Sequence, residues 1–367
     1  MRVLFAGGGT GGHINPAISI ADYAAKQDKD FKALFVGTKS GLETKLVPKA
    51  GYDIEYIEIQ GFDRKHIFRN FETVKKLISA RRKCNKIIKE FKPDCIVCTG
   101  GYVSGPVAMA SKKMKVPSLI HEQNVYPGMT VKGSANYVTY LALSFEETIN
   151  HMQHKEKCVV TGNPIRSEIL HSDYKKSREK LGIKKPFVLI FGGSLGADRI
   201  NDTVIGMLDR ISKDNKIELL FGTGDRNYDK IMNKIKESGI TLSDNIKIVS
   251  YIDNMAECMA AADVVVSRAG AITVSEIAAL GKPSILIPSP NVAENHQYHN
   301  AMALVNAGAA DIIEEKDLTG RLLMQKADNM LSNPEKLAEY AKNARKTAIT
   351  DANERIYSVI KGVLGLV

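Results

Sequence analysis

The stretch from 262 to 300 combines a small-residue turn with polar side chains at a spacing suited to a phosphorylated ligand. A β-branched run at 263–267 is typical of a buried parallel strand. The turn 268–271 follows it, and apolar residues at helical spacing begin near Thr273. Backbone N–H groups and the positive end of the helix dipole favour phosphate at such a turn. Glu276 lies about one turn further on, where a carboxylate can accept both hydroxyls of a ribose, so we predict a sugar-nucleotide site.

The same residues also fit a purely structural role. Thr273 and Glu276 have the spacing of a capping box, S/T-x-x-E, in which two side chains satisfy the first backbone N–H groups of a helix. The spacing alone does not separate capping from ribose binding. Other features favour a ligand: a polar cluster at 294–297 follows the next predicted strand, and further glycine-rich turns occur elsewhere in the chain.

Three of these glycine-rich turns follow predicted strands, at 7–13, 100–106 and 192–197. The first contains G-x-G-x-x-G, a pattern found in dinucleotide sites. Such sites also place an acid at the end of the second strand, but residues 37–39 there hold no carboxylate, which counts against NAD. A single turn of this kind is mostly a tight connection. Several at strand carboxyl ends predict a ligand edge in each half of the chain.

Polar side chains at these edges could bind a ligand or transfer protons. His13 follows the first glycine turn and is a candidate general base, although a histidine that merely packs the turn fits equally well. Four hydrogen-bonding residues at 121–124 end another predicted strand and favour ligand contact. Asn163 and Arg166 lie at a predicted hinge, where a guanidinium could meet a pyrophosphate or form a structural ion pair.

Strands and helices alternate along the whole chain. Strands are predicted at 1–6, 31–37, 53–59, 94–99, 116–121 and 159–162, and then at 187–191, 217–222, 245–249, 263–267 and 284–287. The main predicted helices occupy 16–26, 41–49, 68–91, 104–114 and 353–367. The alternation predicts two doubly wound parallel sheets joined by a linker at 163–166.

Charge is unevenly distributed along the 367 residues. The formal net charge is +10, and residues 1–165 hold 24 lysines and arginines against 15 acidic residues, whereas the remainder holds 27 against 26. The first half is therefore expected to attract an anionic membrane surface, a nucleic acid or an anionic substrate. Within it, residues 68–91 form a basic amphipathic pattern suited either to a solvated helix or to shallow binding on anionic lipid headgroups.

Cysteine usage and hydropathy point to a reduced, cytoplasmic protein. The five cysteines are odd in number and scattered, which is unlike a disulfide framework. Cys95 and Cys98 fall in a predicted strand, where we expect both to pack in the core on one face. No stretch approaches 18 uninterrupted apolar residues, and the chain starts with a strand pattern instead of a signal-peptide pattern.

Several motifs together resemble the MurG family of N-acetylglucosaminyltransferases. They are GGGTGGHINPA, GGYVSGP, HEQN, TGNPIR, GGSLGA and SRAGAITVSEIAALGKPSILIP, in that order along essentially the whole chain. The resemblance implies the GT-B glycosyltransferase fold, with two Rossmann-like domains facing across a cleft. It implies that N-acetylglucosamine moves from UDP-N-acetylglucosamine to the 4-hydroxyl of MurNAc in undecaprenyl-pyrophosphoryl-MurNAc-pentapeptide, with inversion, at the cytoplasmic face of the membrane.

The resemblance also assigns roles to both halves. Residues 1–165 would form an acceptor domain, peripheral to the membrane and covered by a returning helix at 350–367, and residues 166–349 would form the donor domain. The general base would be His13. Donor contacts would come from Thr10, Gly11, Gly12, Asn124, Arg166, Ser194, Ile252, Ala271, Ile272, Thr273, Glu276, His296 and Gln297. Acceptor contacts would come from Tyr102, Ser104 and His121. No metal or cofactor is expected, and no nucleic acid partner.

Two departures from the family pattern and several rival functions remain. Leu195 and His296 stand where some family members have glutamine, which affects contacts near the phosphates and the reading of the sugar hydroxyl. Another GT-B enzyme, such as a diacylglycerol galactosyltransferase or a UDP-sugar 2-epimerase, is the nearest alternative. An NAD(P)-dependent oxidoreductase would share the first glycine turn, but this chain lacks the acid that such an enzyme has after its second strand. A nucleic acid binder would leave the ligand-edge turns unexplained.

Overall fold

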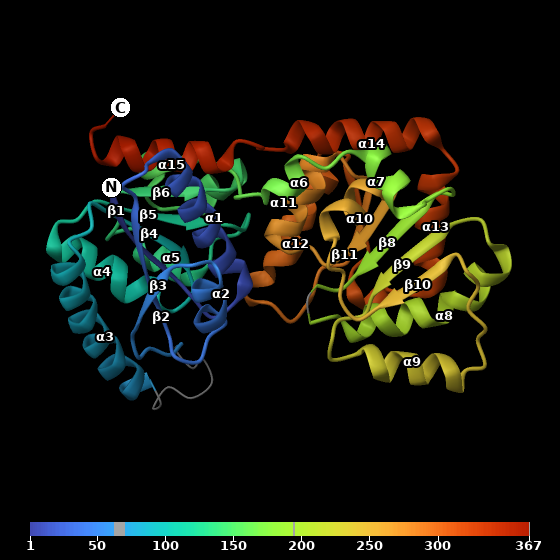
Figure 1. Ribbon diagram of the computed structural model, residues 1–367, viewed down its shortest axis with the longest axis horizontal. Helices are drawn as coiled ribbons and strands as arrows, with labels where there is room; N and C mark the ends of the chain where they lie inside the picture. The colour runs from blue at the N-terminus through green and yellow to red at the C-terminus, as the bar shows by residue number, and fades with distance from the viewer. Residues whose placement is uncertain (62–69, 194, 367) are drawn as a thin grey trace. The chain divides into compact units, whose positions relative to one another are not determined.

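The computed structural model describes residues 1–61, 70–193 and 195–366, and they form two compact α/β units. The first unit comprises Met1–Ile165 together with Asp351–Val367, and the second comprises Arg166–Thr350. Figure 1 shows each unit as a twisted sheet with helices on both faces. The division falls between Ile165 and Arg166, inside the segment that the sequence indicates as a linker.

The first unit is built on a seven-stranded sheet in the order β3-β2-β1-β4-β5-β6-β7. Every neighbouring pair runs parallel. Its strands are β1 (Arg2–Gly7), β2 (Lys32–Gly37), β3 (Asp53–Tyr56), β4 (Cys95–Gly100), β5 (Ser118–Glu122), β6 (Tyr140–Leu143) and β7 (Cys158–Val160). The strand order reverses beside β1 and β4, and ligands of open α/β sheets bind at such a switch point.

Helices cover both faces of this sheet because its strands are apolar on both sides. On one face Val3 and Phe5 pack with α1 and α15, and on the other Leu4 and Ala6 pack with α3 and α4. The helices are α1 (Gly11–Gln27), α2 (Glu43–Lys49), α3 (Asn70–Phe91), α4 (Ser104–Met114), α5 (Met129–Ser134) and α15 (Ala352–Val363). Short 3₁₀ turns, η2 (Glu146–His151) and η3 (Lys155–Lys157), connect the last strands.

The second unit has a six-stranded parallel sheet in the order β10-β9-β8-β11-β12-β13. Its strands are β8 (Phe187–Phe191), β9 (Glu218–Gly222), β10 (Ile246–Val249), β11 (Val264–Ser267), β12 (Ser284–Leu286) and β13 (Ala310–Ile312). Strand order reverses between β8 and β11 in this sheet as well. The predicted doubly wound architecture of two parallel-sheet domains is therefore confirmed.

Helices and 3₁₀ turns flank the second sheet. They are α6 (Ser167–Leu170), α7 (Tyr174–Leu181), α8 (Asp198–Asp214), α9 (Tyr228–Glu237), α10 (Met255–Ala261), α11 (Ala271–Leu280), η4 (Ala293–Asn295), α12 (His296–Asn306), η5 (Glu315–Asp317), α13 (Gly320–Leu331) and α14 (Pro334–Thr347). The amphipathic helices α8 and α9 bury Ile200, Val204 and Ile231 against one face of the sheet.

Some predicted elements differ from the structure. Strands β6 and β13 were absent from the prediction, because each has only three or four residues and lacks a long β-branched run. The first helix begins at Gly11, so Pro16 lies inside it instead of at its start. Cys95 and Cys98 are both fully buried, but on opposite faces of β4. Side chains three residues apart in a strand point in opposite directions, so the expectation of one face was wrong.

The C-terminal helix α15 packs on α1 of the first unit. Ile356 and Ile360 are fully buried in the core that also holds Val3 and Phe5. A tyrosine pair, Tyr23 and Tyr357, meets edge-to-face with ring centroids 5.8 Å apart. In the described residues, no helix is both long and apolar enough to cross a bilayer.

Candidate functional site

In the first unit, two glycine turns pack directly against each other at the carboxyl ends of β1 and β4. A Cβ atom on Gly101 would lie 2.3 Å from the Gly8 carbonyl oxygen, and one on Gly100 would lie 2.7 Å from Cδ2 of His13. Both glycines have positive φ, +108° at Gly100 and +75° at Gly101. Only glycine permits this backbone conformation together with this approach. The turns therefore hold the His13 ring against the backbone of the β4–α4 connection.

The partners of His13 define its tautomer. Its Nδ1 lies 3.2 Å from the Gly8 carbonyl oxygen and 3.4 Å from Oγ1 of Thr10. Because a carbonyl only accepts, Nδ1 carries the hydrogen and Nε2 keeps its lone pair. Burial lowers the pKa of His13, and the Gly8 hydrogen bond and the charge of Glu43 offset this in part. The ring is therefore neutral near pH 7, which is the state that a general base requires.

Glu43, at the start of α2, is a buried carboxylate that the sequence did not reveal as part of this edge. It accepts hydrogen bonds from the Gly9 N–H at 3.0 Å, the Thr38 N–H at 2.9 Å and the Thr38 hydroxyl at 2.8 Å. Burial alone would raise the pKa of Glu43, but these hydrogen bonds outweigh it and hold the pKa below its usual value. The Gly9 amide is thus occupied, while Thr10 and Gly12 beyond it remain exposed.

Two predicted acceptor contacts, Ser104 and His121, are fully buried and bonded within the unit. The Ser104 hydroxyl lies 2.8 Å from the Gly100 carbonyl oxygen and 3.0 Å from that of Ala6. His121 Nε2 lies 2.9 Å from the Gly162 carbonyl oxygen, and Nδ1 lies 2.9 Å from the Gln123 amide nitrogen. Direct ligand contact, as the sequence suggested, is therefore not available to them here. Their observed role is to hold the turns that carry the edge.

Exposed groups nearby come from the loops after β4 and β5. Tyr102 is 61% exposed. Asn124 is half-buried, and its backbone and side-chain N–H groups donate to Oε1 of Glu122 at 2.8 and 3.0 Å. The Gly128 N–H donates to the other carboxylate oxygen at 2.8 Å. The buried carboxylate of Glu122 thus fixes the 124–128 loop, and Tyr102 and Asn124 stay candidates for ligand contact.

The linker residues have partners of their own. Asn163 is buried, accepts from the Ser144 hydroxyl at 2.8 Å and donates to the Gln123 carbonyl oxygen at 3.0 Å. Asn163, predicted to lie at a hinge, is therefore held by hydrogen bonds within the first unit in this conformation. Arg166 Nε donates to Oε1 of Glu276 at 2.8 Å. This is the ion pair that the sequence left open as an alternative for Arg166.

Glu276 lies inside helix α11, so the capping-box alternative is wrong. The helix begins at Ala271 with Gly270 as its N-cap, which places Thr273 third and Glu276 sixth in the helix. The carboxylate is 4% exposed, and its pKa is raised by burial against the opposing effect of Arg166. Arg166 is half-exposed, so it can move into solvent, and the buried carboxylate of Glu276 would then need another hydrogen-bond donor.

The first turn of α11, where the sequence predicts a phosphate site, is partly exposed. The helix ladder begins with the Val274 N–H donating to the Gly270 carbonyl oxygen at 2.9 Å. Ile272 and Thr273, in the turn before this bond, are partly exposed, and Ala271 is buried. The backbone N–H groups in the first turn of a helix point along the helix axis, and the positive end of the helix dipole lies there.

The turn after β8 approaches the turn after β9. A Cβ atom on Gly196, whose φ is +76°, would lie 2.0 Å from the Thr223 carbonyl oxygen. Leu195 beside it is 62% exposed. Ser194, a predicted diphosphate contact, lies outside the described residues.

The polar segment after β12 adopts an unusual backbone. Glu294 and Asn295 both have φ of +51°, in the left-handed region that non-glycine residues rarely occupy. Strain of this kind clusters at ligand sites. His296 and Gln297, both partly buried, then begin helix α12. The Gln297 side-chain oxygen accepts from the Ser289 N–H at 2.9 Å, so it holds the loop after β12.

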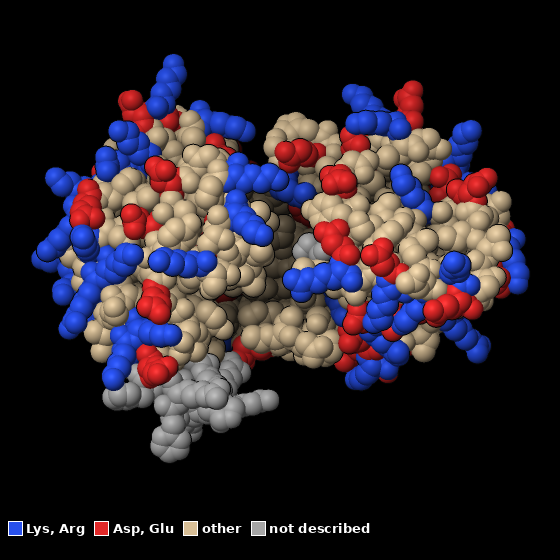
Figure 2. Space-filling view, turned by 60° about the horizontal axis from the view of Figure 1, so that its bottom comes forward, with Lys and Arg blue, Asp and Glu red and all other residues tan. Residues whose placement is uncertain are grey.

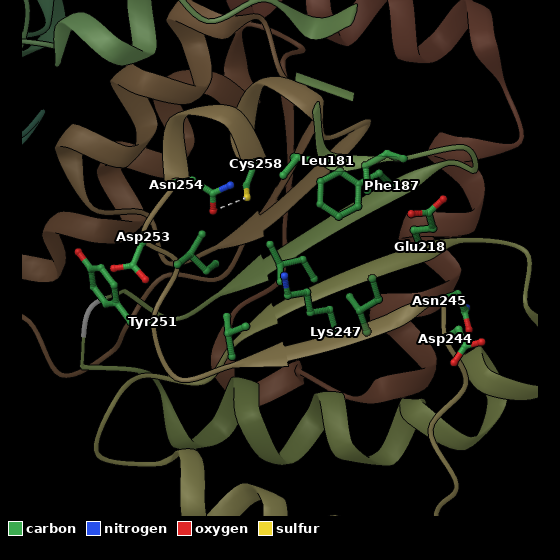
Figure 3. A pocket seen from close by; sticks show the side chains of 15 residues that line it. Leu181, Phe187, Glu218, Asp244, Asn245, Lys247, Tyr251, Asp253, Asn254 and Cys258 are labelled. Atoms are coloured by element: carbon green, nitrogen blue, oxygen red, sulfur yellow. Dashed lines mark hydrogen bonds between the residues drawn. The ribbon is translucent and has the colours of Figure 1, made fainter. Parts of the chain in front are cut away.

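Ile252, a predicted donor contact, helps to line a cavity of 320 Å³ (Figure 3). Its side chains lie on the face of β8, β9 and β10 that is turned away from α8. Leu220 and Val249 are among the residues that line it, and Tyr251 and Asp253 stand at one end. The volume lies at the lower end of the range for small-molecule pockets.

A second cavity, of 340 Å³, lies near the 294–297 segment. Its walls include Pro288, Pro290, Asn295 and Tyr298. It is thus adjacent to the residues that we expect to meet the sugar. Among the described residues, no group of three or more His, Cys, Asp or Glu side chains is arranged to hold a metal ion.

Comparison with known proteins places this geometry in context. The N-terminal domain model of glycosyltransferase family 28 matches residues 3–143, and the C-terminal domain model matches residues 187–356. The UDP-N-acetylglucosamine–N-acetylmuramyl-(pentapeptide) pyrophosphoryl-undecaprenol N-acetylglucosamine transferase of Acetivibrio thermocellus is 48% identical, over 99% of this chain and 98% of that protein. The protein of the same name from Bacillus cytotoxicus is 42% identical, over 99% and 100%.

Solved structures agree with these relatives. MurG of Acinetobacter baumannii matches with a TM-score of 0.79 and 26% identity, over 98% of this chain and 99% of that one. The UDP-GlcNAc 2-epimerase of Neisseria meningitidis, solved with UDP-GlcNAc, matches with a TM-score of 0.68 and 15% identity, over 99% and 100%. At that identity the second likeness shows a shared fold and nothing further.

Proposed function

The chain belongs to the MurG family within glycosyltransferase family 28, and from that premise we propose that it makes a β-1,4 link between N-acetylglucosamine and a lipid-linked MurNAc-pentapeptide. The donor is UDP-N-acetylglucosamine, and the acceptor is the undecaprenyl-pyrophosphoryl glycan. The observation that carries this proposal is the full-length similarity to transferases of that name. The geometry of both units supports it.

On the donor side, the second unit offers complementary groups for each part of UDP. The buried carboxylate of Glu276 can accept the ribose hydroxyls once Arg166 moves away, and the exposed N-terminal turn of α11 suits the diphosphate. The cavity beside Ile252 suits a uracil ring. His296 and Gln297 would read the sugar hydroxyls. Once released from Glu276, Arg166 would stabilise the negative charge of the diphosphate as the bond between the sugar and the diphosphate breaks.

On the acceptor side, His13 acts as the general base. The acceptor 4-hydroxyl oxygen attacks the anomeric carbon, the bond from that carbon to the diphosphate oxygen breaks, and UDP leaves with the bonding electrons. The hydroxyl proton passes to Nε2 of His13, whose Nδ1 hydrogen is already donated to the Gly8 carbonyl. The exposed Tyr102 and the half-buried Asn124 would position the acceptor.

The decisive assay measures UDP release from UDP-N-acetylglucosamine with and without a lipid-linked MurNAc acceptor analogue, in EDTA. We expect release that requires acceptor and survives EDTA, since the N-terminus of α11 and Arg166 would stabilise the leaving diphosphate in place of a metal ion. Release without acceptor would favour an epimerase or a hydrolase. Tight UDP binding with no release would keep the donor site and contradict the proposed acceptor.

His13→Gln tests the base within the same assay. We expect kcat to fall by about 100-fold or more, with the Kd for UDP unchanged, because the groups proposed above for the uracil, ribose and diphosphate lie in the second unit. Gln preserves the size and polarity of the ring better than Ala, so the turn keeps its packing. Unchanged turnover would rule out His13 as the base.

The first unit is also proposed to bind the cytoplasmic face of an anionic membrane through α3. Arg81, Arg82, Lys86 and Lys89 are exposed on this helix, whereas Ala80, Cys84, Ile87 and Ile88 face the core. Val74 and Ile78 add apolar surface, each 43% exposed. Figure 2 shows lysine and arginine side chains over the visible face of this unit.

Vesicle sedimentation tests this membrane contact. Vesicles with a third of anionic lipid should bind the protein, and about 0.5 M salt should release it, because exposed charges are screened at that ionic strength. The double variant Arg81→Glu with Arg82→Glu should bind at least tenfold more weakly. Lys230→Glu with Lys236→Glu, in the second unit, is the matched control. Equal losses in both variants would contradict a contact centred on α3.

A further inference from the structure

One peptide group connects the buried Glu43 carboxylate to the candidate base. The Gly9 N–H donates to Oε2 of Glu43 at 3.0 Å, and the Gly8 carbonyl accepts from Nδ1 of His13 at 3.2 Å. The Gly8 carbonyl and the Gly9 N–H belong to the same peptide unit. Carboxylate, peptide and imidazole therefore form one continuous chain of hydrogen bonds, and hydrogen bonds in such chains polarise one another.

The carboxylate is fixed in this place by its surroundings. Glu43 is fully buried. Cβ atoms added to Gly8, Gly37 or Gly41 would each come within 2.7 Å of its side chain, so the backbone closes around it. The Thr38 amide and hydroxyl satisfy its other oxygen. A carboxylate that accepts this many hydrogen bonds keeps its negative charge inside the protein.

We propose that Glu43 is a positioning residue for the transfer reaction, which acts on His13 through the Gly8–Gly9 peptide. The inference rests on the proposed function, because it takes His13 to be the base. A negative charge at Glu43 polarises the peptide, strengthens the Gly8 carbonyl as an acceptor, holds the Nδ1–H tautomer and stabilises the imidazolium that forms when Nε2 receives the acceptor proton.

Among the described residues, the other groups in contact with the His13 ring are uncharged. The β1–α1 turn contributes the neutral Thr10 hydroxyl, and the β4–α4 turn contributes the backbone of Gly100. Glu43, from α2, is the charged group whose field raises the pKa of His13 against the effect of burial. A solely structural role, tying the glycine turn to β2, would instead depend on the hydrogen bonds of Glu43 and not on its charge.

Glu43→Gln separates these two roles, because it keeps the shape of the side chain and an acceptor oxygen but removes the charge. NMR titration of the eight ring-labelled histidines, with His13 assigned from its loss in His13→Gln, gives the pKa of His13 directly. We expect the pKa to fall by about half a unit or more in Glu43→Gln. The acid limb of the pH profile of kcat should move to lower pH by the same amount, and kcat should be about tenfold lower.

Thr38→Val is the matched control, since it removes a hydrogen bond to the same carboxylate and leaves the charge. It should leave the pKa of His13 in place. An unchanged pKa in folded Glu43→Gln, or an equal shift in Thr38→Val, would overturn the inference. A shifted pKa with an unmoved acid limb would support the coupling of Glu43 to His13 and contradict His13 as the base. Absence of transferase activity in the wild type would refute the proposed function while the titration still reported the coupling.

Discussion

At the scale of single residues, the charge of Glu276 should matter most for donor binding. We expect Glu276→Gln to weaken UDP binding by about tenfold or more, because a buried carboxylate that accepts two ribose hydroxyls makes charge-assisted hydrogen bonds. Calorimetric titration with UDP measures the loss. Titration with 2′,3′-dideoxy-UDP should show no difference between variant and wild type, because that ligand lacks the hydroxyls.

The matched control for this prediction is Asp328→Asn. Asp328 is also paired with an arginine, at 3.5 Å from Arg210, but it lies on the exposed surface of α13. The Asp328→Asn variant should bind UDP as tightly as the wild type does. If Glu276→Gln lost affinity for both nucleotides equally, its effect would lie in the packing of α11 and not in ribose recognition.

His121 should make the first unit sensitive to acid. Burial lowers the pKa of this histidine to about 4, against about 6.5 in the unfolded chain. Between these values the unfolded chain binds more protons, so stability is full above pH 6.5 and is lost as the pH falls toward 4. The contribution lost between pH 7 and pH 5 is about 2 kcal/mol.

Denaturant unfolding of the first unit at pH 7 and pH 5 measures this effect. We expect His121→Asn to be less stable at pH 7 but to lose about 2 kcal/mol less than the wild type on going to pH 5. His171→Asn, an exposed position in the second unit, should keep the wild-type dependence. If the stability of His121→Asn depended on pH as that of the wild type does, another group would be responsible for the sensitivity to acid.

At the scale of elements, the packed turns after β1 and β4 should tolerate no side chain. Gly101→Ala should destabilise the first unit by about 2 kcal/mol or more, because the added Cβ meets the Gly8 carbonyl and alanine disfavours a φ of +75°. The matched control is Gly105→Ala in α4, where nothing lies within 4 Å of the added atom. It should be neutral or stabilising, since alanine favours a helix.

Thermal unfolding with a transferase assay checks both variants. Gly101→Ala should also lower kcat, because displacement of the Gly8 carbonyl removes the partner of Nδ1 of His13. Equal melting temperatures for the two variants would contradict the close packing of the turns.

Elements with clear local patterns were predicted well, and two short strands were missed. The helix Ser104–Met114 was predicted with its observed bounds, because its glycine turn and apolar spacing are clear. The strands β6 and β13 were not predicted, since three or four residues carry too little pattern. The early start of α1 at Gly11 also could not be read, because tertiary packing overrides the low helix propensity of glycine.

At the scale of the whole molecule, α15 should contribute strongly to the stability of the first unit, although it lies far in sequence from the unit's other elements. Ile356→Ala should cost about 3 kcal/mol, because this fully buried side chain packs in the core of α1 and β1. The exposed Ser358→Ala on the same helix is the control and should change little. Hydrogen exchange of α1 amides locates the effect, and unchanged protection in Ile356→Ala would contradict it.

The sequence by itself determined the alternation of strands and helices, the two parallel sheets, the family, and the sheet edge at which we predict ligand binding. Those features follow from local patterns and from motifs with fixed spacing. Only the tertiary structure decided which polar residues stay exposed at that edge. Ser104 and His121 proved to be buried, and Glu276 proved to be buried and paired with Arg166.

Glu43 is the clearest example of a residue whose place in the site could not be predicted from the sequence. It stands six residues beyond the end of β2, where no motif points to it, yet its carboxylate reaches the glycine turn of β1. Hydrogen bonds between segments distant in sequence depend on how strands pair and turns pack. No local pattern encodes that pairing, because it is set by the balance of burial and satisfied polar groups across the whole unit.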